Sequence, residues 1–157
     1  MNKNMLNSFR KQYASMWKML DDGLDKTGDE IWKKNVDISF FVPARLLLHI
    51  IETIDYYFDN NPGEFKWNTV CDWEHVEDTR LESKKDLKEY EAKVKEKVKQ
   101  WFNAKENVDL NAPEQTFKTD WATDLERAIY VLRHTQHHLG QLSHDLQRRG
   151  YEEIQWD

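Results

Sequence analysis

The chain has 157 residues, 13% aromatic and 33% charged, and its 23 basic and 29 acidic side chains give a formal net charge of −6. This charge disfavours nucleic-acid binding, which needs a clustered basic surface. The single cysteine excludes an intramolecular disulfide framework. The N-terminal residues contain no apolar run of signal-peptide length, and the longest apolar stretch, around residues 46–51, is too short to cross a bilayer. We therefore expect one cytoplasmic domain over residues 1–157 that binds neither nucleic acid nor membranes.

The low content of turn-forming residues, 5 glycines and 3 prolines, favours a few long helices. Four segments carry apolar residues at the three- and four-residue steps of amphipathic helices. The first is expected over residues 4–24, with Gly23 or Gly28 as its stop signal. The second is expected to begin at Pro43 and to end before the breaker at residues 60–63.

The third and fourth helices have N-terminal signals of their own. Ser83, with Asp86 three residues later, predicts the start of the third helix. Thr119 or Asp120 is expected to cap the fourth, which then runs over residues 121–149. The connection between the second and third helices is about twenty residues long, and loops of that length are uncommon. The sequence therefore predicts an all-α four-helix bundle with a long crossover connection.

Four of the six histidines fall in RHTQHHLGQLSHD, residues 133–145, within the last predicted helix. His134 and His138 lie one turn apart on one helix face and can share one ion, whereas His137 and His144 are expected to point outward. Two imidazoles at this spacing form a chelate for a first-row metal.

A third ligand must come from another helix, and His49 is the leading candidate. It lies on the flank of the apolar stripe of the second predicted helix, so we expect it to face a neighbouring helix. Glu52 is a candidate fourth ligand or hydrogen-bond acceptor beside the site. Gln141, one turn beyond His138, is placed to hydrogen-bond a ligand or a bound water.

Other interpretations of these residues stay open. His49 could be an ordinary core histidine, and the pair at residues 134 and 138 an ordinary feature of a helix surface. Cys71, four residues before His75, is a weaker candidate nucleophile. The aromatic residues of the helices are expected to belong to the core rather than to a stacking platform.

The segment HTQHHLGQ, residues 134–141, resembles the last-helix signature of the DinB/YfiT-like superfamily: a histidine, two residues, two histidines, one residue and Gly-Gln. The resemblance implies that His134 and His138 are metal ligands and that His49, in RLLLHIIET, is the third. It also implies a homodimer. The superfamily includes bacillithiol- or mycothiol-dependent S-transferases and isomerases, and members described only as metal-dependent enzymes or hydrolases. Leu139 stands where arginine is frequent in that family.

Three neutral imidazoles leave an ion with open positions, which is typical of catalytic rather than structural sites. One divalent transition metal, zinc, nickel or iron, would keep water or a low-molecular-weight thiol deprotonated there. We therefore expect a metal-dependent enzyme that acts on a small molecule, as a hydrolase or as a thiol S-transferase. The alternatives are a non-catalytic metal- or partner-binding module that dimerises, and a bundle that binds a small molecule without metal.

Overall fold

The computed structural model describes residues 3–35, 42–67, 75–117 and 123–156. Within these ranges the chain forms four long helices and two short 3₁₀ turns. The helices are α1 (Lys3–Lys26), α2 (Pro43–Tyr57), α3 (Lys84–Ala104) and α4 (Asp124–Arg148), and the turns are η1 (Pro62–Glu64) and η2 (Asp78–Arg80). The predicted all-α bundle is confirmed.

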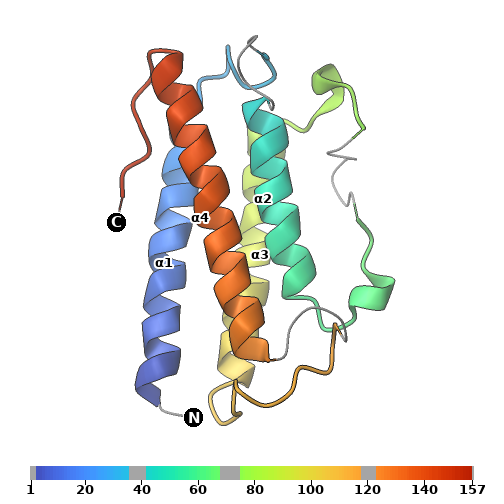
Figure 1. Ribbon diagram of the computed structural model, residues 1–157. Coiled ribbons are helices and arrows are strands. Elements are labelled where there is room, and N and C mark those ends of the chain that lie inside the picture. The colour runs from blue at the N-terminus through green and yellow to red at the C-terminus, as the bar shows by residue number, and fades with distance from the viewer. Residues whose placement is uncertain (1–2, 36–41, 68–74, 118–122, 157) are drawn as a thin grey trace.

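The long connection between α2 and α3 allows these two helices to run parallel (Figure 1). Helices α2 and α3 run in the same direction, and η1 and η2 lie in the long connection between them (Figure 1). Arg45 of α2 holds this connection by donating hydrogen bonds to the carbonyl oxygen of Val76 and to the Asp78 carboxylate, the latter over 2.9 Å. Helix α4 lies antiparallel to α2, and the two helices pack directly against each other.

Most of the predicted helix ends are confirmed. Pro43 occupies the first turn of α2, and the Ser83 hydroxyl accepts a hydrogen bond from the Asp86 amide over 3.2 Å at the start of α3. Gly150 follows the end of α4 with a φ of 82°, a left-handed conformation that glycine adopts without steric cost.

Two expectations about helix ends are wrong. Helix α4 begins at Asp124 instead of residue 121, because Thr123 caps it by accepting the Glu126 amide over 3.2 Å. Residues 123–126 have the sequence T-x-x-E, which is the capping-box signature of a helix N-terminus. The two cap residues expected from the sequence, Thr119 and Asp120, lie outside the described residues. Gly23 lies inside α1, where a Cβ atom would come within 3.0 Å of the Ile154 side chain. Close packing of the C-terminal segment therefore explains this glycine.

The apolar stripes predicted from the sequence form the core. The apolar residues that recur at three- and four-residue steps along α3 are buried: Leu87, Tyr90, Val94, Val98, Trp101 and Phe102. Helix α2 is the most enclosed, with Leu47, Ile50, Ile51 and Ile54 fully buried. In the described parts of the chain, no helix is both long and apolar enough to cross a bilayer.

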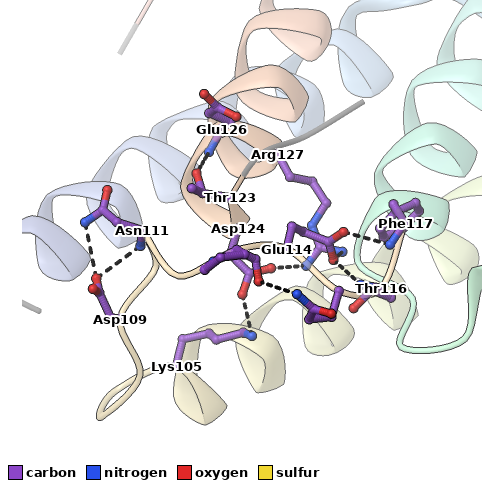
Figure 2. Close-up of polar contacts among 12 residues, drawn as sticks. Lys105, Asp109, Asn111, Glu114, Thr116, Phe117, Thr123, Asp124, Glu126 and Arg127 are labelled. Atoms are coloured by element: carbon purple, nitrogen blue, oxygen red, sulfur yellow. Dashed lines mark hydrogen bonds and ion pairs between the residues drawn. The ribbon is translucent and has the colours of Figure 1, made fainter. Parts of the chain in front are cut away.

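The connection from α3 to α4 is fastened to the start of α4 by a buried cation (Figure 2). Arg127 donates to Asp124 over 2.6 Å, forms an ion pair with Glu114 at 3.5 Å and lies 4.7 Å from the centre of the Phe117 ring. The Glu114 carboxylate in turn accepts the backbone amides of Thr116 and Phe117, each over 2.7 Å. A buried guanidinium is tolerated when carboxylates and ring faces replace its water, and here it fixes Phe117 against the bundle.

Helices α1 and α3 meet around a buried carboxylate. Glu91 of α3 is only 3% exposed, 3.1 Å from the Lys95 ammonium, which also pairs with Asp21 of α1 at 2.6 Å. Burial raises the pKa of Glu91 from 4.5 to about 7 despite the lysine. Between those two pH values the folded chain therefore binds more protons than the unfolded chain, and the free energy of unfolding falls as pH rises through that interval.

The substitution Glu91→Gln removes the ionising group while keeping its shape. We expect it to raise the free energy of unfolding at pH 8 by on the order of 2 kcal/mol, and to change it little at pH 4.5, because a buried neutral group needs no desolvation of charge. Urea unfolding of both proteins at the two pH values measures this. Glu89→Gln on the exposed side of the same helix is the control and should show no such pH-dependent gain. An equal effect of Glu91→Gln at both pH values would contradict the assignment.

Candidate metal centre

Three histidine side chains from two helices converge beside the contact between α2 and α4. His49 projects from α2, and His134 and His138 project from successive turns of α4. The Nε2 atom of His134 lies 3.3 Å from Nε2 of His49 and 3.1 Å from Nε2 of His138. One ligand atom from each of the three lies within 4.8 Å of the others.

These separations fit one metal ion held by three imidazoles. Metal–nitrogen bonds of about 2.0–2.1 Å, at tetrahedral or octahedral angles, place ligand nitrogens roughly 3.0–3.4 Å apart. The two measured separations, 3.3 Å and 3.1 Å, lie in this range. The three rings are partly buried, so a few open positions would remain for a ligand from solution.

Electrostatics keep the three imidazoles neutral at physiological pH. Burial, followed by repulsion from His138 and then from His134, lowers the pKa of His49 to about 3. Burial, followed by repulsion from neighbouring histidines, lowers the pKa of His134 to about 4, and burial also lowers the pKa of His138. The lone pairs are therefore available to a metal without competition from protons near neutrality.

Gln141 orients one of the three rings. Its Oε1 atom lies 2.6 Å from Nδ1 of His138, so this nitrogen carries the proton and donates it to the amide oxygen. The Nε2 atom of His138 is thereby left with its lone pair facing the other two histidines. The position of Gln141, one turn beyond His138, predicts this hydrogen bond to a metal-binding histidine.

The remaining candidates lie in different surroundings. Glu52 is fully buried but does not belong to the group of three histidines, so its role as fourth ligand or acceptor stays a prediction. His137 and His144 are exposed, as predicted, and so is His75. Cys71 lies outside the described residues. Leu139, where the family often has arginine, is buried in the core.

Sequence reasoning missed the aromatic side chains that adjoin the three histidines. The Tyr130 ring lies 5.7 Å from the His134 ring, centre to centre, and Tyr57 of α2 lies 5.3 Å from Tyr130. Both tyrosines pack against the core but remain partly exposed. The available signal was the spacing of Tyr130, one helical turn before His134, together with that of Tyr57, two turns after His49.

Comparison with known proteins gives one match. The family model described as DinB family matches residues 1–157, the whole chain. No curated protein and no solved structure matches significantly. Together with the three-histidine cluster, the family match indicates a divalent metal site.

The hydrogen bond from His138 to Gln141 can be tested by metal affinity. We expect Gln141→Leu to weaken zinc binding by about 10- to 100-fold, because the ring loses the acceptor that fixes its tautomer and direction. Competition with a chromogenic chelator measures the affinity. Gln100→Leu is the matched control, since Gln100 is exposed on α3, where its side chain donates to Glu96. Equal affinities of the two variants would show that Gln141 does not position His138.

Proposed function

This chain belongs to the DinB family, and we propose that it is a metal-dependent enzyme whose divalent ion is held by His49, His134 and His138. The observation that carries the proposal is the convergence of three histidine side chains, with Nε2 of His134 at 3.3 Å and 3.1 Å from those of His49 and His138 and all three ligand atoms within 4.8 Å of one another. A lone histidine in a bundle core is ordinary, but three adjoining histidines that all have lowered pKa values are not.

The ion would supply a Lewis acid that keeps a water or thiol nucleophile deprotonated near neutral pH. The residues of the chain supply the remaining parts. The three histidines occupy one side of the ion, and Gln141 holds His138 in the tautomer that binds it. The leucines and isoleucines of α2 behind the site exclude water from that side.

We propose that the substrate is a small molecule and the reaction either hydrolysis or transfer to a low-molecular-weight thiol of the bacillithiol or mycothiol type. Both reactions use the same activation of a nucleophile, so the same three ligands serve either. We propose no nucleic-acid partner, because the chain carries an excess of acidic groups. The homodimer stays an expectation of the family resemblance.

The metal content of the purified protein tests the proposal. Protein prepared without a polyhistidine tag should hold about one transition-metal ion per chain by inductively coupled plasma mass spectrometry, and His138→Ala should hold almost none, because two imidazoles on separate helices bind far more weakly than three. His144→Ala removes an exposed histidine of the same helix and should retain the metal. Helix content by circular dichroism controls for folding.

The same samples distinguish the two reaction classes. Metal-loaded protein is incubated with 4-nitrophenyl esters, and separately with bacillithiol and an electrophile, and each rate is compared with that of His138→Ala. Full metal retention in His138→Ala would overturn the assignment of His138 as a ligand. No metal in the wild type after addition of zinc or nickel would overturn the proposed function and favour a non-catalytic helical module.

A further inference from the structure

A continuous set of aromatic side chains leads away from the three histidines along the α2–α4 contact. We call it the aromatic row, and it consists of Tyr56, Tyr57, Phe65, Trp67, Phe117 and Tyr130. Its members come from α2, from the crossover after α2, from the connection before α4 and from α4 itself. The row therefore forms only when these four segments of the chain are folded together.

The row begins at a metal ligand. The His134 and Tyr130 rings are 5.7 Å apart and inclined at 32°, and Tyr130 meets Tyr57 at 5.3 Å. From Tyr57 the contacts continue to Phe117 at 5.5 Å, and through Tyr56 to Trp67 at 4.3 Å. A group bound to the ion on this side would therefore reach Tyr130 first.

The rings of the aromatic row are less buried than the rings of the core. Each of its members is at least partly exposed, and Trp67 is 47% exposed. The aromatic rings of the true core, Tyr13, Phe58 and Phe102, are buried and lie on the inner side of the bundle. Partly exposed rings that touch one another and adjoin a set of metal ligands are typical of a ligand-binding wall.

The middle of the row is held rigid by charge. Phe117 is fixed by the Glu114 carboxylate, which accepts its backbone amide, and by the buried Arg127 guanidinium 4.7 Å from its ring (Figure 2). Side chains that are already held in place lose little conformational entropy when a flat ligand binds against them. The same residues that fasten the connection to α4 thus preorganise this surface.

We propose that the aromatic row is a substrate subsite that takes an aryl group attached to the reacting centre. The proposal rests on the proposed metal function and adds to it the class of substrate. Planar rings are favoured over saturated rings of similar size because edge-to-face and offset contacts with tyrosine and phenylalanine add to simple burial of apolar area.

Three hydroxamates that chelate zinc separate the two parts of this proposal. Acetohydroxamate reports the ion alone, benzohydroxamate adds an aryl group, and cyclohexanecarbohydroxamate adds a saturated ring of similar size. We expect the zinc-loaded wild type to bind the benzo compound roughly 3- to 10-fold more tightly than the cyclohexane compound in isothermal titration calorimetry. Tyr130→Leu should abolish this preference and leave the affinity for acetohydroxamate unchanged, whereas Tyr130→Phe should keep both.

Trp156→Leu is the control for loss of an exposed aromatic side chain outside the aromatic row, because Trp156 is 73% exposed. It should keep the full aryl preference. Equal affinities of wild type for the benzo and cyclohexane compounds, with acetohydroxamate still binding, would overturn the aryl subsite and leave the metal centre intact. This comparison needs no variant, so it holds even if Tyr130→Leu does not fold.

Failure of the metal function gives a different pattern. In that case no hydroxamate binds, and the row is tested on metal-free protein by saturation-transfer NMR with benzyl alcohol and cyclohexylmethanol. A stronger signal from benzyl alcohol that Tyr130→Leu removes would support the aryl subsite without a metal centre. Equal signals from the two alcohols would overturn the subsite as well.

Discussion

Two imidazoles from one helix and one from another can meet only where α2 and α4 pack side by side, and the side chains of α2 set that contact. Leu47, Ile50, Ile51 and Ile54 are fully buried, so α2 cannot turn about its axis without exposing aliphatic surface. At about 25 cal/mol per Å² of apolar surface, such a rotation costs several kcal/mol. His49 is therefore held toward α4 by hydrophobic packing on the other faces of its own helix.

The second constraint is the buried charge at the start of α4. Arg127, Asp124 and Glu114 bury their charges together, which is tolerable only while each partner is present. The cluster ties the α3–α4 connection to α4 and carries Phe117 to the end of α2. Hydrophobic packing thus positions the metal ligands, and a cluster of charged side chains about two turns before His134, at the start of α4, positions Phe117.

Local signals in the sequence account for most of the fold. The apolar periodicity of α3 predicts every buried member of its stripe, and Ser83 caps it where expected, because both effects act within a few residues. The start of α4 was misplaced because residues 119 and 120 are also capping types, and only the pairing of Thr123 with Glu126 identifies the cap that is used.

The site also has parts that local sequence predicts and parts that depend on contacts between distant segments. The helical spacing of His134, His138 and Gln141 is sufficient to place them on one face, and the contact of Gln141 with His138 follows from it. The approach of His49 depends on which helices are neighbours, and the resemblance to a family supplied that where periodicity could not. The aromatic row joins Tyr57 to Phe117 and Tyr130, which follow it at a long distance in the sequence, so no single helical period reveals it.

The three histidines and the bundle affect each other through folding. Without an ion, the Nε2 atom of His134 lies 3.3 Å and 3.1 Å from those of His49 and His138, distances at which one neutral imidazole can donate its N–H to the next, and burial makes it costly for either His49 or His134 to gain a second proton. An ion that binds only the folded chain would replace these contacts with three bonds and stabilise the fold in proportion to the logarithm of its concentration. The most enclosed helix of the bundle is therefore also the one best suited to present His49, because its packing holds this side chain toward α4 before an ion binds.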